Sequence, residues 1–184
     1  MLVRLEKPSL KREREFLTAA HRSRRFLRRW ATPPSSSRAF RAYVRRSSTP
    51  THQGRFVVLR ASGDLVGVIN LNEIVRGSFQ AAYLGCYAFQ PHAGRGHMAE
   101  GVRLVLRRAF GELRLHRVEA NIQPENTSSL TFFRHLGFRR EGYSPRYLRV
   151  GGRWRDHERW ALLAEEWRKG PSNRPMQRTR GELA

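Results

Sequence analysis

The hydrophobic periodicity changes between residues 46 and 55, and this change constrains the fold more than any other feature. Upstream, residues 9–30 and 38–46 carry apolar side chains at the spacing of amphipathic helices, and "TPPSSS" separates the two segments. Downstream, "RFVVLR" and "LVGVINL" are typical of strands, and the segment 61–64 between them favours a hairpin. The sequence therefore predicts two N-terminal helices followed by a sheet.

Beyond residue 79, strands and helices alternate. "FQAAYLGCYAF" predicts a third strand, in which Gly85 favours a bulge or a close backbone approach. A glycine turn, a helix ending near Leu113, the strand "HRVEANI", a second helix in "PENTSSLTFFRHLGF" and a closing hairpin follow. Asn126 is a suitable N-cap for the second helix, and Gly137 a suitable residue to end it. This order predicts an α/β fold with a mixed sheet, not a doubly wound parallel one.

Composition limits the number of domains and the cellular compartment of the protein. The 184 residues, 39% of them hydrophobic, are enough for one domain with a core, and no apolar run approaches the roughly 18 residues that span a bilayer. The charged N-terminus lacks the apolar centre of a signal peptide, and Cys86 has no second cysteine with which to form a disulfide. We therefore expect a cytoplasmic protein without membrane contact. Residues 170–184 contain little to bury, which predicts a disordered basic tail after a domain of residues 1–169.

The net charge of +21, from 36 basic and 15 acidic residues, favours polyanionic partners such as RNA, ribosomes or a phosphorylated cofactor. All but three of the basic residues are arginine, the exceptions being Lys7, Lys11 and Lys169. A GC-rich coding bias produces the same preference, so the charge by itself does not identify a partner.

The turn "GRGHMAEG", residues 94–101, has the form of a backbone that wraps around a phosphate at a helix N-terminus. A dinucleotide-binding fingerprint requires the first strand of a parallel βαβ unit and an acidic residue about 20 positions later. Here the preceding strand follows a hairpin, and Glu119 lies 25 residues after Gly94. A nucleoside-triphosphate loop is excluded because no Gly-Lys-Ser/Thr follows the turn. On the glycines alone, a purely structural turn remains the alternative.

In its context the turn resembles the GNAT N-acetyltransferase superfamily, and specifically its RimJ/RimL-type ribosomal-protein-alanine N-acetyltransferases, with the RimJ branch most alike. The resemblance covers roughly residues 9–167 and is carried by "NEIVRGSFQAAYLGCYAF", "HRVEANIQPENTSSLTFFRHLGFRREGY" and "GGRWRDHERWALL". It implies a mixed, mostly antiparallel sheet that is splayed at its centre and flanked by helices, two of them at the N-terminus.

The resemblance also implies that the turn holds the pyrophosphate of acetyl-CoA, the co-substrate of the family. The histidines show no ligand spacing such as H-E-x-x-H, so no metal is proposed. The family loop begins with Gln or Arg where this chain has Pro91, a change that removes a side chain but keeps the backbone amides. The strand before the loop would hydrogen-bond the pantetheine. The cofactor-binding residues implied are Tyr87, Ala88, Phe89, Gly94, Arg95, Gly96, His97, Met98, Asn121 and Asn126.

For catalysis, Ser129 matches the serine that protonates the leaving thiolate in RimL-type enzymes, although an ordinary first-turn helix serine would look the same. The positions that carry a glutamate base in RimL- and RimI-type enzymes are Arg146 and Asn121 here. Glu73 is a candidate replacement that could equally be structural. Asp156 and His157 lie in the closing hairpin, where an ion pair with a neighbouring arginine is expected. A water-mediated deprotonation is therefore favoured.

The acceptor implied is the N-terminal α-amine of a ribosomal protein, with alanine or serine first, because an amine of reference pKa about 7.7 to 8.0 needs no strong base. The basic surface could add contact with the ribosome or its RNA. Trp30, Phe40 and Tyr83 could line the acceptor groove, or simply belong to the core. Two alternatives remain: a basic RNA-binding module with little catalysis, and an acetyltransferase for a small amine such as an aminoglycoside or a polyamine.

Overall fold

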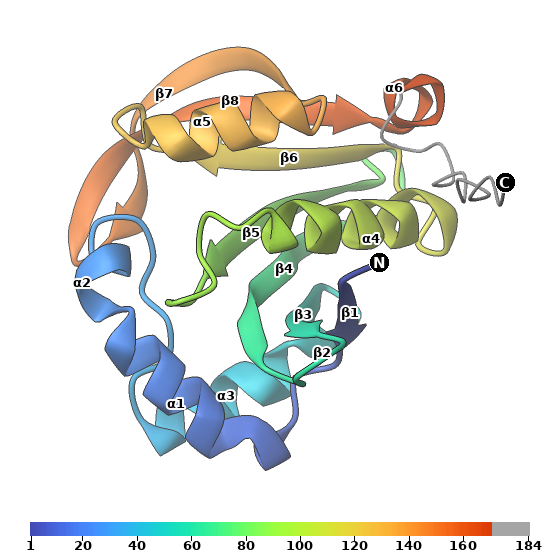
Figure 1. Ribbon diagram of the computed structural model, residues 1–184. Helices are drawn as coiled ribbons and strands as arrows, with labels where there is room; N and C mark the ends of the chain where they lie inside the picture. Colours follow the sequence, from blue (N-terminus) through green and yellow to red (C-terminus); the bar gives the residue numbers. More distant parts are fainter. Residues whose placement is uncertain (171–184) are drawn as a thin grey trace, which may run out of the picture.

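A computed structural model of the chain describes residues 1–170, and its main element is one eight-stranded sheet (Figure 1). The strand order is β1-β3-β4-β5-β6-β8-β7, and β2 pairs with β3 alone. The strands are β1 (Val3–Glu6), β2 (Ser48–Thr49), β3 (His52–Leu59), β4 (Leu65–Val75), β5 (Ala81–Ala88), β6 (Arg117–Ile122), β7 (Arg139–Val150) and β8 (Arg153–Leu163). The predicted mixed α/β fold is confirmed.

The parallel contact between β5 and β6 is short. It consists of three residue pairs, from Ala81 opposite Arg117 to Tyr83 opposite Glu119, whereas the other strand pairs are antiparallel. Beyond Tyr83 the two strands continue without pairing to each other, and Figure 1 shows them diverging toward their carboxyl ends. The sheet is therefore splayed at its centre, as the resemblance implies.

The helices cover both faces of the sheet. They are η1 (Leu10–Arg12), α1 (Glu13–Arg22), α2 (Arg24–Leu27), α3 (Ser37–Arg46), α4 (His97–Gly111), α5 (Thr127–His135) and α6 (Ala164–Lys169). Side chains of a strand alternate between its two faces. Along β3, Val57 accordingly packs in the core with α4 and α5, whereas Phe56 and Val58 pack in a second core with α1 and α3.

The second helix of the alternating region begins and ends as the sequence predicts. The side chain of Asn126 accepts a hydrogen bond of 3.3 Å from the backbone N–H of Ser129 and so caps α5. Gly137, just past the helix end, has a φ of 93°, a conformation that glycine adopts at little cost. The position of α5, and with it Ser129, is thus determined by local chemistry.

Three expectations about the fold were wrong or incomplete. The predicted helix over 9–30 is divided into η1, α1 and α2, with a break at the buried Ser23, whose hydroxyl accepts a hydrogen bond from the backbone N–H of Gln90. Strands β1 and β2 and helix α6 were not predicted, because each is too short to show a periodicity. Gly85 makes no bulge, since the pairing with β4 is regular there and shifts between Asn72 and Val75 instead. The predicted disorder beyond Gly170 concerns residues 171–184, outside the described residues.

Gly67 joins β4, β5 and α4 at a close backbone approach. A Cβ atom at this position would lie 2.5 Å from the carbonyl oxygen of Tyr87 and 2.7 Å from the sulfur of Met98. We predict that Gly67→Ala lowers the free energy of unfolding by about 1 to 3 kcal/mol, because the backbone of β5 must move. Urea denaturation measures this change. Gly111→Ala is the matched control, since a Cβ there meets nothing within 4 Å, and it should not destabilise the protein. Equal stability of the two variants would contradict the prediction.

Candidate active site

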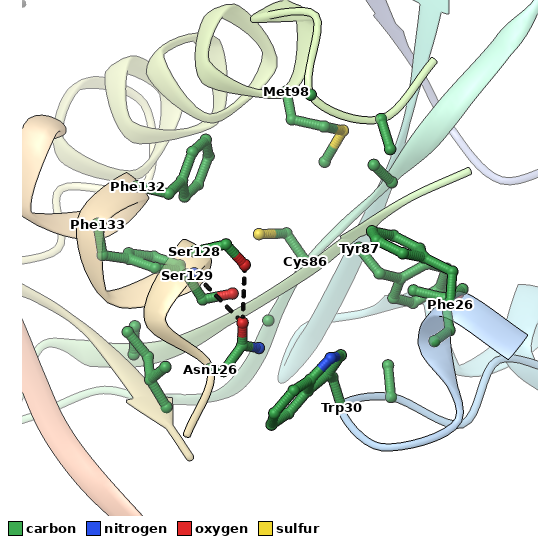
Figure 2. A pocket seen from close by; sticks show the side chains of 18 of the residues that line it. Phe26, Trp30, Cys86, Tyr87, Met98, Asn126, Ser128, Ser129, Phe132 and Phe133 are labelled. Carbon is green, nitrogen blue, oxygen red and sulfur yellow. Dashed lines mark hydrogen bonds between the residues drawn. The ribbon is translucent and has the colours of Figure 1, made fainter. Parts of the chain in front are cut away.

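A cleft of about 730 Å³ occupies the opening between β5 and β6. It is lined by residues of both strands, by the glycine turn before α4, by the first turns of α5, and by the segment around α2. Figure 2 shows that β5 divides the labelled side chains into two groups. Met98, Phe132 and Phe133 lie on the side of α4 and α5, and Phe26, Trp30 and Tyr87 lie on the other. We call these the helix side and the acceptor side of the cleft.

The helix side is apolar and contains the chain's one cysteine. Met98 and Phe132 come from α4 and α5, and the sulfur of Cys86 points between them (Figure 2). Burial raises the pKa of the Cys86 thiol to about 12, so the group is neutral and acts as a small apolar surface. This compartment suits an uncharged, flexible chain such as pantetheine.

The glycine turn closes one end of the cleft. Gly94 and Gly96 both have a φ of 78°, and a Cβ atom at either would meet nothing within 4 Å. Gly96 is the N-cap of α4, a 15-residue helix, and supplies no side chain to its free N–H groups. The first amides of the helix and its positive dipole end therefore form an open site for an anion. Gly94, Arg95, Gly96 and Met98 line the cleft, whereas His97 does not.

The three residues at and just past the end of β5 that are implied as pantetheine contacts differ. Tyr87 and Ala88 line the cleft. Phe89 is 0% exposed, packs against Phe16 in the second core, and donates its backbone N–H to the carbonyl of Val66 at 2.7 Å. Its side chain and its N–H are therefore engaged away from the cleft. Gly85 lines the opening and is exposed, so the missing side chain leaves room for a ligand rather than for a neighbouring backbone.

Three polar residues meet where β6 leads into α5. Asn126, Ser128 and Ser129 line the cleft, and the Oδ1 of Asn126 accepts hydrogen bonds from the Ser128 hydroxyl at 3.0 Å and from the Ser129 N–H at 3.3 Å (Figure 2). Asn121 also lines the cleft, and its buried Oδ1 has no partner among the described residues. An unpartnered buried acceptor is costly, so the geometry suits a ligand that donates a hydrogen bond there.

The structure does not bring Glu73 to this cleft. Glu73 has a φ of 47° at the irregular end of β4, and its carboxylate lies 3.3 Å from the Nε2 of His52. It lines a separate hollow of about 150 Å³ together with Tyr83 and Glu119. Phe40 is also absent from the cleft, because it is 0% exposed in the second core. Of the three aromatic residues considered for the acceptor groove, only Trp30 lines the cleft.

The ion pair with a neighbouring arginine that was expected at Asp156 and His157 is absent from the described residues. Asp156 accepts hydrogen bonds from the Tyr143 hydroxyl and from the backbone N–H of Arg146. His157 is 3% exposed and lines the cleft. Strand alternation could have placed His157 at the cleft. In "DHERW" the histidine shares a face of β8 with Arg159, and Arg159 pairs with Asn121 of β6.

The described residues that line the cleft include no aspartate and no glutamate. Within residues 1–170 there is also no group of three His, Cys, Asp or Glu side chains that could hold a metal ion. No helix in the same range is both long and apolar enough to cross a bilayer.

Comparison with known families identifies the family to which this fold belongs. The model of the acetyltransferase (GNAT) domain matches residues 3–139. The chain belongs to the GNAT family. In this GNAT chain the match includes the glycine turn, β6 and α5, and so most of the residues that line the cleft.

Individual N-acetyltransferases are also similar to this chain. A segment of 107 residues, 58% of this chain, is 39% identical to the Escherichia coli ribosomal protein uS5-alanine N-acetyltransferase and spans 55% of that protein. The structure of Mycobacterium smegmatis RimJ in complex with CoA-disulfide superposes with a TM-score of 0.84 at 25% identity, over 92% of this chain and 86% of that chain. Vibrio cholerae spermidine N-acetyltransferase, with CoA and spermine, gives a TM-score of 0.77 over 90% of this chain and 98% of that chain. At 19% identity, this last likeness shows the fold alone.

Proposed function

We propose that this chain transfers the acetyl group of acetyl-CoA to the N-terminal α-amine of a ribosomal protein whose first residue is alanine or serine. The observation that carries the proposal is the two-sided cleft, with an open amide turn at one end and no carboxylate among the described residues that line it. The similarity to a uS5-alanine N-acetyltransferase supports this class of acceptor. The catalytic unit proposed is residues 1–169.

In this proposal the pyrophosphate of acetyl-CoA lies on the turn from Gly94 to Met98, and the pantetheine follows Tyr87 and Ala88 between the splayed strands. The open Cβ positions of Gly94 and Gly96 support the first part, because a phosphate can approach the backbone there. The apolar helix side and the unpartnered Oδ1 of Asn121 support the second, since the pantetheine has amide N–H groups to donate.

The reaction proposed is direct attack of the amine nitrogen on the thioester carbonyl carbon. Ser129 would protonate the sulfur that leaves, and Asn126 holds the start of α5 so that the serine faces the cleft. The capping hydrogen bond is donated by the backbone N–H of Ser129, so the Ser129 hydroxyl takes no part in it.

The absence of carboxylates from the described cleft lining favours an acceptor with a single positive charge. A polyamine carries several ammonium groups, and their burial without carboxylate partners would be costly. An N-terminal α-amine carries one such group and loses its proton near neutral pH. The net charge of +21 would repel a free basic protein but favour one that lies beside ribosomal RNA.

The first test concerns the turn. Gly96→Glu should lower the affinity for acetyl-CoA at least tenfold, about 1.4 kcal/mol, because the new carboxylate repels the pyrophosphate. Calorimetry measures the affinity. Gly63→Glu is a matched control, since Gly63 has the same φ of 78° and open surroundings but lies in the β3–β4 turn outside the cleft. If both variants bind acetyl-CoA like the wild type, the turn is not the pyrophosphate site.

The second test concerns Ser129 as the general acid. Ser129→Ala should lower kcat more than tenfold with an acetyl-CoA affinity within about twofold of wild type, because the proton is transferred mainly in the transition state. Ser128→Ala, which also removes a first-turn hydroxyl of α5 from the cleft lining, should change kcat by less than about threefold. Steady-state CoA release measures both, and equal rates for the two variants would assign the protonation to water.

The third test concerns the acceptor. CoA release is measured with peptides that begin with alanine, serine or other residues, with ribosomal proteins, and with spermidine and an aminoglycoside. We expect turnover of α-amines, faster on assembling ribosomal subunits than on the isolated protein, with an advantage that shrinks as salt rises. Mass spectrometry of ribosomal-protein N-termini with and without the gene identifies the target. Efficient acetylation of the small amines alone would replace this proposal, and tight RNA binding without turnover would favour a binding module.

A further inference from the structure

His157 occupies the acceptor side of the cleft although it belongs to the closing hairpin. Asn121 alternates along β6 with Ala120 and Ile122, which pack in the core with α4 and α5, so Asn121 projects from the opposite face. The pairing of Asn121 with Arg159 places Arg159 on that face, and His157, two residues away on β8, shares it. The ring is 3% exposed and lines the same cleft as Asn121 and Ser129.

The tautomer of His157 follows from the hydrogen bond that its ring makes. Its Nδ1 lies 2.9 Å from the backbone carbonyl oxygen of Arg155. A carbonyl oxygen only accepts hydrogen bonds, so Nδ1 carries the proton and the neutral ring has its lone pair on Nε2. The bond also restricts rotation of the ring. His157 therefore presents a fixed proton acceptor.

The other titratable groups of the lining are unsuited to this role. Burial raises the pKa of Cys86 to about 12 and that of Tyr87 well above its usual value, so neither is ionised at neutral pH. His92 belongs to the glycine-turn end of the cleft, where its Nε2 lies 3.9 Å from Asp64. Arg95 is always protonated. Among the described residues that line the acceptor side, His157 is therefore the one titratable group suited to act as a base.

Resting on the proposed function, we propose that His157 is the general base of the reaction, and that its Nε2 accepts a proton from the ammonium group of the acceptor. The neutral amine then forms a C–N bond with the thioester carbonyl carbon. The C–S bond breaks, its electron pair leaves with the sulfur, and the thiolate takes the second amine proton by way of Ser129. The imidazolium of His157 returns its proton to solvent, which completes the balance.

The surroundings of His157 define the pH dependence. Burial lowers its pKa from 6.5, and the hydrogen bond to Arg155 and the charges of Asp156 and Glu125 oppose this shift. The ring of Tyr147 on β7 lies 6.3 Å away, centroid to centroid. The ring is therefore neutral at pH 7, and activity should be lost as pH falls below 6.5 and protonates Nε2.

The experiment is the pH profile of kcat/KM for His157→Asn, whose amide nitrogen can still donate to the Arg155 carbonyl but whose side chain cannot accept a proton. The wild type should show an ionisation below pH 6.5, and the variant should lack it, with kcat/KM at pH 7 lower by about 100-fold or more. Acetyl-CoA affinity should remain within about twofold. His135→Asn is the matched control, since His135 on α5 makes the same kind of bond, from Nδ1 to the Thr131 carbonyl at 2.8 Å, but is exposed and outside the cleft.

The outcomes separate this proposal from the function on which it rests. If His157→Asn still acetylates peptides and keeps the wild-type pH profile of kcat/KM, the proposed role of His157 is overturned but the proposed function is not. If only small amines are acetylated, the acceptor assignment fails, and the same comparison with that amine decides the role of His157. If no amine is acetylated, both proposals fail. Thermal unfolding checks that the variant is folded, and His157→Gln, which preserves more of the side-chain volume, is the second variant if it is not.

Discussion

The three-residue parallel contact between β5 and β6 is the constraint on which the site depends. Two parallel strands need a crossover, here α4, and each helix that follows a strand starts at that strand's carboxyl end. The turn before α4 and the first residues of α5 therefore meet at the same edge of the sheet. Because the strands stop pairing at Tyr83, this edge is an open cleft and not a closed sheet.

The splay also gives the cleft a lining from both faces of the sheet. The face toward α4 and α5 is apolar, with Met98 and Phe132, and accommodates a neutral chain better than a charged one. The opposite face carries His157, whose imidazole suits an amine. A thioester and an amine that enter from opposite faces would meet between the strands, with Ser129 near one and His157 near the other. In the proposed function, the site thus separates two substrates of different polarity.

Much of the fold is predictable because it depends on short-range chemistry. The hydrophobic runs of β3, β4 and β5, the Asn126 cap and the positive φ of Gly137 all follow from residues within a few positions of each other. The break at Ser23 is different, because its buried hydroxyl bonds to Gln90, 67 residues away. Strand β1 also depends on residues distant in the sequence. It pairs with β3, and the backbone N–H groups of Leu2 and Val3 donate hydrogen bonds to Glu100.

The sequence by itself determined the class of fold, the glycine turn and the position of Ser129 at the start of α5, since backbone conformation and capping are local. The tertiary structure alone decided which side chains share the cleft. Glu73 and His157 lie in similar strand patterns, yet the irregular end of β4 directs Glu73 toward His52, and the register of β6 with β8 sets His157 on the face of Asn121. That register is fixed by pairing between strands about 40 residues apart, which local residue patterns do not encode.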